Sequence, residues 1–238
     1  MKILAIDSSG LVASVAIVED DNLLGEYTMN YKKTHSQTLL PMLDEVARMM
    51  ELDMKTIDVI AVSAGPGSFT GLRIGSATAK GLALALGKEI VSVPTMDAMA
   101  YNLWGCDKQI CPLMDARRQQ AYTGRYTFDE GQFITIEPQN VLSIEEIINQ
   151  INESGRETVF LGDGVDVFKE YIEQNITVSY YFAPANNNKQ RAASVAVLGA
   201  ALYKEGKAQP AELHKPEYLR LSQAERERQE RERDFKIC

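Results

Sequence analysis

A glycine-rich stretch, residues 64–75 (AGPGSFTGLRIG), is the part of this sequence whose residue types most directly suggest chemistry. It follows a short run rich in Val and Ile (residues 58–63) and precedes helix-compatible residues up to 86, so a strand, a tight turn and a helix are predicted. Backbone N–H groups at the start of such a helix point into the turn, which suits a bound phosphate or another anion. The same glycines also suit a tight connection that binds nothing, and both interpretations stay open.

An aspartate after the first apolar run is a second candidate for phosphate or magnesium chemistry. Residues 2–6 read as a buried strand, and Asp7-Ser8-Ser9-Gly10 follows directly. An acid in this place can hold Mg²⁺ or face a phosphate, but Asp-Ser-Ser is equally ordinary turn chemistry. Asp7 and Ser8, with Gly65 and Gly67 of the turn, are therefore the candidates for a nucleotide site.

Two familiar catalytic motifs are absent from the sequence. The Walker A pattern requires Lys and then Ser or Thr after its last glycine, whereas Gly71 is followed by Leu-Arg. The only histidines are His35 and His214, so there is no H-E-x-x-H zinc motif. Because the residue at i+4 from His35 is Leu39, we expect His35 to cap or pack at a helix start rather than to bind a metal.

Composition bounds the function further. The chain has 238 residues and a formal net charge of -8, which argues against nucleic-acid binding by general electrostatics. No apolar run reaches membrane-spanning length, and the first apolar run is too short for a signal peptide, so we expect a cytoplasmic protein. Cys106, Cys111 and Cys238 fit neither a disulfide framework nor a zinc pair, and free thiols are expected.

The elements that would position these residues are predicted in the same order twice. Each half begins with a strand that ends in an aspartate (Asp7 or Asp115), continues with two strands and a helix, and then has a strand, a glycine-containing turn and a helix. The predicted strands are residues 2–6, 11–18, 23–29, 58–63, 89–93, 110–114, 121–128, 132–137 and 158–161. Helices are predicted from residues 34–36 to 50, up to 86 after the glycine turn, and over 95–104, 143–151, 165–173 and 192–203. This alternation predicts an α/β fold with a mixed sheet covered by helices in each half.

Three regions follow from this order. Residues 1–107 are expected to form one domain and residues 108–221 a second, with the helix over 190–205 packing back on the first. Residues 218–220 look like a further strand. Residues 222–238 are a tail of alternating Glu and Arg, which predicts a solvated helix held by i,i+4 pairs or a frayed end, because the charges largely cancel.

Six segments together resemble the TsaB family, also called YeaZ: IDSS, THSQTLLPMLDEV, SAGPGSFTGLRIGSATAKGLA, VPTMDAMA, MDARRQQAYTG and KPEYLR. The resemblance covers nearly the whole chain and implies two ribonuclease-H-like domains of the actin-like ATPase fold. It implies a scaffold for a catalytic paralogue, TsaD, which with the ATPase TsaE forms N6-threonylcarbamoyladenosine at position 37 of tRNAs that read codons beginning with A. It also implies a homodimer when TsaD is absent, tRNA contact through the complex, and ATP use by the partners with no cofactor in the isolated chain.

The same resemblance implies that the catalytic metal site is missing. TsaD holds its metal with an H-x-x-x-H pair shortly after a valine-proline, and Asp97 and Tyr101 occupy those two places here. One carboxylate and one phenol are poor ligands for a transition metal in place of two imidazoles. No catalytic residue and no metal ligand is therefore expected, and Asp7, Ser8, Gly65 and Gly67 would be vestiges of a nucleotide site.

A stripe of small residues marks the helix after the glycine turn. Gly71, Gly75 and Ala79 recur every four residues, and glycine inside a helix costs roughly 1 kcal/mol relative to alanine, which suggests that a neighbour approaches closely. That neighbour is either the chain's own sheet or a partner. Since the resemblance implies pairing with TsaD through this helix and the one before it, the predicted interface is Leu39, Leu43, Leu72, Gly75, Ser76 and Ala79. Tryptophan at position 76 or 79 is then expected to abolish pairing and leave a folded monomer.

Two rival functions remain. An actin-like ATPase would use Asp7 and the turn at residues 65–68 to bind and hydrolyse ATP. A metallopeptidase would need ligands that two histidines far apart in the sequence do not provide.

Overall fold

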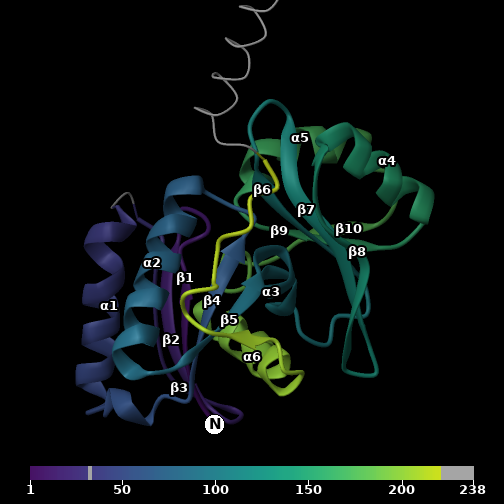
Figure 1. Cartoon of the computed structure of the whole chain (residues 1–238). Helices are drawn as coiled ribbons and strands as arrows, with labels where there is room; N and C mark the ends of the chain where they lie inside the picture. Colours follow the sequence, from purple (N-terminus) through teal and green to yellow (C-terminus); the bar gives the residue numbers. More distant parts are fainter. Residues whose placement is uncertain (32–33, 221–238) are drawn as a thin grey trace, which may run out of the picture.

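The computed structural model describes residues 1–31 and 34–220. They form two mixed β-sheets, each covered by helices, as predicted for the α/β class (Figure 1). The charged tail and Cys238 lie outside the described residues.

The N-terminal sheet has the strand order β11-β5-β4-β1-β2-β3. Strands β1 to β3 form an antiparallel meander, β4 and β5 run parallel to β1, and β11 pairs antiparallel with β5. The central strands are buried on both faces, which explains their continuous apolar sequences. The bounds are β1 (Lys2–Asp7), β2 (Ala13–Glu19), β3 (Asn22–Met29), β4 (Val59–Gly65), β5 (Glu89–Pro94) and β11 (Ala208–Gln209).

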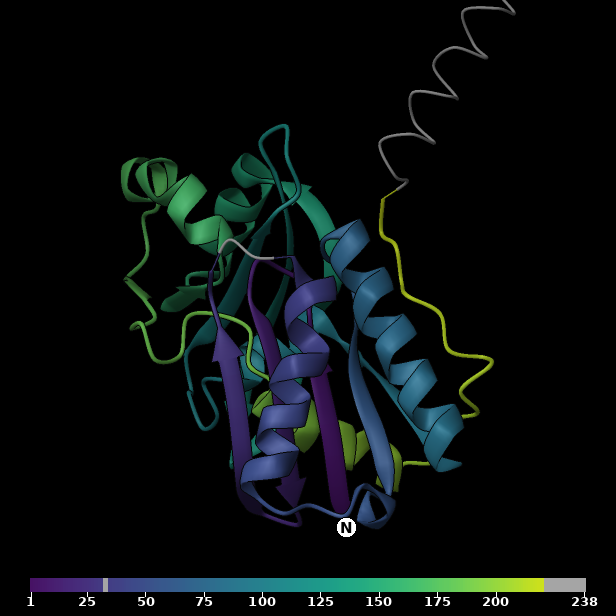
Figure 2. The same cartoon turned by 90° about the vertical axis from the view of Figure 1, so that its left-hand side faces the viewer.

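Different helices cover the two faces of this sheet. Helices α1 (His35–Met49) and α2 (Phe69–Leu86) lie side by side on one face, where they enclose a core with Leu4 and Ile6 of β1 (Figure 2). Helix α6 (Ala192–Lys204) packs on the opposite face against Ile3 and Ala5. Alternate residues of β1 thus serve two cores, as the two-residue period of a strand requires. A short 3-10 helix, η1 (Met54–Thr56), precedes β4.

The C-terminal sheet repeats this plan in the order β10-β9-β6-β7-β8. Strands β6 to β8 form the meander, while β9 and β10 extend the sheet in parallel. The repeat predicted from the sequence is therefore present in the strand order. The bounds are β6 (Gln109–Asp115), β7 (Gln120–Asp129), β8 (Gln132–Ser143), β9 (Thr158–Leu161), β10 (Tyr180–Phe182), α3 (Thr95–Tyr101), α4 (Ile144–Ser154) and α5 (Gly164–Asn175).

The segment after α6 runs along α2 towards the C-terminal half (Figure 1). His214 is buried under it between Ser92 and Ser76, and the Lys80 ammonium donates to the carbonyl of His214. Further on, Arg220 donates to the carbonyl of Ala116 in the C-terminal half. The segment thus ties the two halves together.

The prediction of a strand at residues 218–220 is wrong. Residues 214–218 have no regular structure and residues 219–220 form a bend. The backbone of Glu217 donates to Ala64, but the contacts that follow are made by the side chains of Tyr218 and Arg220 rather than by a ladder. Strands β10 and β11 were not predicted, because three and two residues are too short to show an alternating pattern.

Candidate functional site

At each of the four glycines of the turn, atoms of the chain itself occupy the space that a side chain would need. A Cβ at Gly67 would lie 2.3 Å from the carbonyl oxygen of Ser9, and one at Gly71 would lie 2.1 Å from that of Ser8. At Gly75 it would meet the hydroxyl of Ser8 at 2.4 Å. Gly65 has a φ of 123°, and a Cβ there would lie 2.2 Å from the carbonyl oxygen of Glu217. These glycines are required by close packing within the chain, with no ligand invoked.

Asp7 and Ser8 hold this packing in place. The Asp7 carboxylate accepts from the backbone N–H of Ser9 at 2.8 Å and from its hydroxyl at 2.7 Å, which is the turn chemistry considered above. Burial raises the pKa of Asp7, while the bonds from Ser9 oppose that rise. The Ser8 hydroxyl donates to the carbonyl of Gly71 at 2.9 Å, and the N–H of Ser68, the N-cap of α2, donates to Ser9 at 2.6 Å. The strand end and the glycine turn are locked to each other.

The two residues that the resemblance aligns with metal ligands also make internal contacts. Asp97 accepts a 2.7 Å hydrogen bond from the buried hydroxyl of Tyr126, and burial raises the pKa of Asp97. Tyr101 packs edge-on against Phe128 and Phe133, each at 5.6 Å between ring centroids. Both residues therefore join α3 to the core of the C-terminal sheet. Among residues 1–31 and 34–220, no three His, Cys, Asp or Glu side chains are placed to hold a metal ion.

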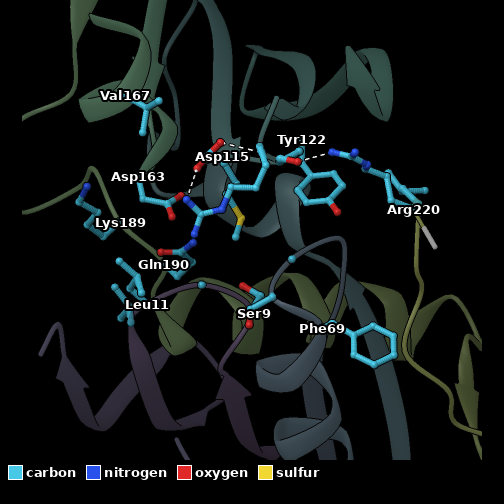
Figure 3. Close-up of a pocket in the computed structure, with 18 of the residues that line it drawn as sticks. Ser9, Leu11, Phe69, Asp115, Tyr122, Asp163, Val167, Lys189, Gln190 and Arg220 are labelled. Atoms are coloured by element: carbon cyan, nitrogen blue, oxygen red, sulfur yellow. Dashed lines mark hydrogen bonds and ion pairs between the residues drawn. The ribbon is translucent and has the colours of Figure 1, made fainter. Parts of the chain in front are cut away.

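A cavity of about 760 Å³ lies between the two halves (Figure 3). Ser9, Leu11 and Phe69 line it from the N-terminal half, and Asp115 and Asp163 from the C-terminal half. Asp115 accepts from the backbone N–H of Arg117 at 2.7 Å and forms a 3.4 Å ion pair with its guanidinium. Burial raises the pKa of Asp163, and the neighbouring carboxylates of Asp115 and Asp166 add to the rise.

The six residues of the predicted interface are all buried within the monomer. Gly71 and Gly75 face Ser8 at the end of β1, so the small-residue stripe packs against the chain's own sheet, the first of the two alternatives. A tryptophan at position 76 or 79 would have to displace core side chains, and such variants test folding rather than pairing. The six residues are Leu39, Leu43, Leu72, Gly75, Ser76 and Ala79.

The outer faces of the same helices carry exposed apolar side chains that the sequence did not single out. Leu40 and Met49 of α1 are 53% and 72% exposed, and Leu84 of α2 is 56% exposed. Leu40 directly follows the buried Leu39, so hydrophobicity alone does not separate the inner from the outer face. His35, at the start of α1, forms a 2.8 Å hydrogen bond with the carbonyl of Gly10, in keeping with the expected packing role.

The fold and this cleft define a class of protein. Two halves, each with an antiparallel meander beside parallel strands and a cavity between them, are the arrangement of the two-domain actin-like ATPase fold. No helix within the described ranges is both long and apolar enough to span a membrane.

Comparisons with known proteins narrow the class to a family. Residues 22–228 match the family model "TsaD: tRNA N6-adenosine threonylcarbamoyltransferase". The chain is 32% identical to the tRNA threonylcarbamoyladenosine biosynthesis protein TsaB of Bacillus subtilis, over 94% of this chain and 96% of that protein. It is 29% identical to TsaB of Escherichia coli, over 92% and 95%. The solved structure of YeaZ from Pseudomonas aeruginosa superimposes with a TM-score of 0.77 at 25% identity, covering 92% of this chain and 99% of that one.

The chain therefore belongs to the TsaB family. This membership gives it a role in tRNA threonylcarbamoyladenosine biosynthesis.

Proposed function

We propose that the chain is a non-catalytic scaffold subunit that binds TsaD and, with TsaE, supports the formation of N6-threonylcarbamoyladenosine at position 37 of tRNAs reading codons that begin with A. It works in the cytoplasm, contacts tRNA through the complex and carries no cofactor of its own, since the partners use the ATP. In the absence of TsaD it forms a homodimer.

The observation that carries this proposal is the set of contacts that Asp97 and Tyr101 make within the chain. The family resemblance aligns them with the two histidines of the catalytic paralogue, and both side chains are committed to contacts with the C-terminal core. A residue that is needed for packing is not free to bind a metal. The glycine turn supports the same conclusion, because backbone atoms of Ser8, Ser9 and Glu217 fill the space beside its glycines.

The outer face of α1 and α2 is the surface that we propose for TsaD. Leu40, Met49 and Leu84 are exposed on two adjacent helices of one face (Figure 2). Single exposed apolar residues are common on any protein, but covering the exposed part of each of these would gain about 1–2 kcal/mol, enough for a central contact. The buried interface residues predicted from sequence then support this face from within.

A reconstituted modification assay tests the non-catalytic role. Asp115→Ala removes a carboxylate that lines the cavity, and Asp7→Asn removes the carboxylate at the end of β1 while keeping an acceptor for Ser9. Both variants are expected to keep most of the modification activity, because neither carboxylate takes part in the chemistry. A loss of several orders of magnitude with unchanged complex assembly would show that this subunit contributes a reacting group.

The alternative function is an ATPase acting alone, and the cavity between the halves is the observation in its favour. Calorimetry of the isolated chain with ATP and Mg²⁺ separates the two functions. Micromolar binding accompanied by turnover would favour the ATPase, whereas the scaffold proposal expects no turnover.

A further inference from the structure

The hairpin between β6 and β7 contains backbone conformations that are strained for its residue types. Arg117, Arg118 and Gln119 have φ values of 65°, 58° and 58°, a region that residues other than Gly, Asn and Asp rarely adopt. Hairpin turns with positive φ usually carry Asn or Gly, which would fit here without strain. The chain instead places two arginines at consecutive strained positions. Strain of this kind is typical of residues kept for a function.

Both arginines of this hairpin face solvent. The Arg117 side chain is 88% exposed and has one ion pair, with Asp115 at 3.4 Å. The Arg118 guanidinium is exposed and makes no hydrogen bond or ion pair with any residue in the described ranges. The chain has 33 acidic residues against 25 basic ones, so carboxylates to neutralise Arg118 are plentiful. An arginine left without one keeps its charge available to another molecule.

Two further arginines lie near this hairpin or the cavity: Arg220 lines the cavity, and Arg73 contacts two residues that line it. Arg220 donates to the carbonyl of Ala116 at the base of the hairpin. Arg73 of α2 lies 4.0 Å above the ring of Phe69 and donates to the Tyr218 hydroxyl at 3.2 Å. Phe69, Tyr218, Arg117 and Arg220 all line the cavity, and Figure 3 shows Phe69 and Arg220 at its edge. We call the set Arg73, Arg117, Arg118 and Arg220 the arginine rim.

Some of the carboxylates near the arginine rim make other contacts. Glu217 accepts a 3.1 Å hydrogen bond from Gln139, and Asp166 pairs with Lys189 at 2.9 Å. Asp115 is shared between the backbone and the guanidinium of Arg117. Among the described residues, Arg117 is the only one of the four rim arginines that forms an ion pair with a carboxylate, so the other three guanidinium groups keep their charge for another molecule.

We propose that the arginine rim contacts the sugar–phosphate backbone of RNA, with the ring of Tyr218, which packs against Phe69 and is 39% exposed, beside it to contact an unpaired base. A planar guanidinium forms paired hydrogen bonds to a phosphate, and aromatic rings next to arginines are the usual platform for single-stranded RNA. The inference rests on the proposed function, which brings tRNA to the complex. With a net charge of -8 the isolated chain binds tRNA only in the non-specific range, about 10⁻⁴ to 10⁻⁶ M at physiological salt.

The test uses the complex reconstituted with TsaD and a tRNA transcript, and measures the dissociation constant over a range of salt concentrations. The variant is Arg117→Gly/Arg118→Gly, which removes two charges and relieves two strained positions. We expect weaker RNA binding and a smaller slope of log K against log salt, by about 1 for each lost phosphate contact. The melting temperature should be unchanged or higher, which a merely structural role of the arginines would not allow.

Two controls make the result specific. Arg156→Ala removes an exposed arginine of the same half outside the arginine rim and should leave the slope unchanged. Arg118→Lys keeps the charge and should retain most of the salt dependence. An unchanged slope in the double-glycine variant overturns the inference. So does loss of TsaD from the complex of that variant in size-exclusion chromatography, since the rim would then meet an acidic protein surface.

A second arm separates this inference from the proposed function. The isolated chain is cross-linked to the same transcript at low salt, with and without the two glycine substitutions. If TsaD does not bind the chain, the proposed function fails, and cross-links at the rim that disappear in the variant still support RNA contact. If wild type and variant cross-link equally or not at all, the inference is wrong whatever TsaD does.

Discussion

His214 is a titratable group enclosed by the chain rather than placed for chemistry. Its Nδ1 atom lies 2.8 Å from the hydroxyl of Ser92 and its Nε2 atom 2.9 Å from that of Ser76. Burial, with a smaller contribution from the charge of Lys80, lowers the pKa of His214 to about 4 from the usual 6.5. The imidazole is therefore neutral in the folded protein at physiological pH.

This lowered pKa predicts that stability falls with acidification. Between pH 6.5 and 4 the unfolded chain binds a proton at His214 that the folded chain does not, so the free energy of unfolding decreases as the pH drops through that window. We expect this residue to contribute a loss of about 1–2 kcal/mol between pH 7.5 and 5. Urea unfolding of wild type and His214→Gln at both values measures it, because glutamine keeps hydrogen-bonding capacity but does not titrate. An equal loss in both proteins would contradict the assignment.

At the scale of elements, helix α2 contains two glycines with opposite surroundings. Gly71 faces the backbone of Ser8, where an added Cβ would lie 2.1 Å from a carbonyl oxygen. Gly81 is exposed and has no atom within 4 Å of such a Cβ. Both lie in one helix, so the intrinsic preference for alanine is the same and only the surroundings differ.

This pair predicts stability changes of opposite sign. Gly71→Ala should lower the free energy of unfolding by about 1–3 kcal/mol, because backbone atoms have to move and the gain in helix propensity does not offset that strain. Gly81→Ala should raise it by up to about 1 kcal/mol, the propensity difference alone. Chemical denaturation of the two variants decides the matter. Equal effects would mean that the turn does not pack against Ser8 as described.

The sequence predicted the positions of helices and strands better than it predicted which side of each helix is buried. The repeated order of strands and helices is visible in the sequence because most elements span several residues of regular pattern. The very short strands β10 and β11 were not predicted. The stripe of Gly71 and Gly75 looks the same whether a strand or a partner approaches it. Which of Leu39 and Leu40 points outward depends on the rotation of α1 against the sheet, and only the three-dimensional arrangement fixes that rotation.

The same limit applied to the candidate site. The strand, glycine turn and helix were predicted from residues 58–86, but the atoms that fill the turn come from Ser8, Ser9 and Glu217. Glu217 is more than 140 residues away in the sequence, and no local pattern could place it there. The strained hairpin at Arg117 lay within a family motif, although nothing in its composition showed positive φ.

At the scale of the whole molecule, the two halves are tied together by side-chain contacts at more than one place. Asp97 bonds to Tyr126 across the halves, and the last described segment joins α2 to the β6–β7 hairpin through Tyr218 and Arg220. The scaffold role that we propose requires no closure on a substrate, and such contacts between the halves are compatible with it. The function of the chain is then expected to reside in the faces that it offers to partners.

Complex formation with TsaD is the measurement that tests this account most directly. Size-exclusion chromatography with light scattering compares wild type, Leu40→Glu/Leu84→Glu and Val197→Glu, each mixed with TsaD. Val197 is the matched control, since it is a 41% exposed aliphatic residue on α6, which covers the opposite face of the same sheet. Circular dichroism verifies that all three proteins are folded.

We expect wild type and Val197→Glu to elute with TsaD as one species, and the double variant to elute separately as a folded monomer, because two buried carboxylates would face an apolar contact. A wild-type chain that forms no complex with TsaD would contradict the scaffold function itself. A folded double variant that still binds TsaD as tightly as wild type would contradict the assignment of the α1–α2 face.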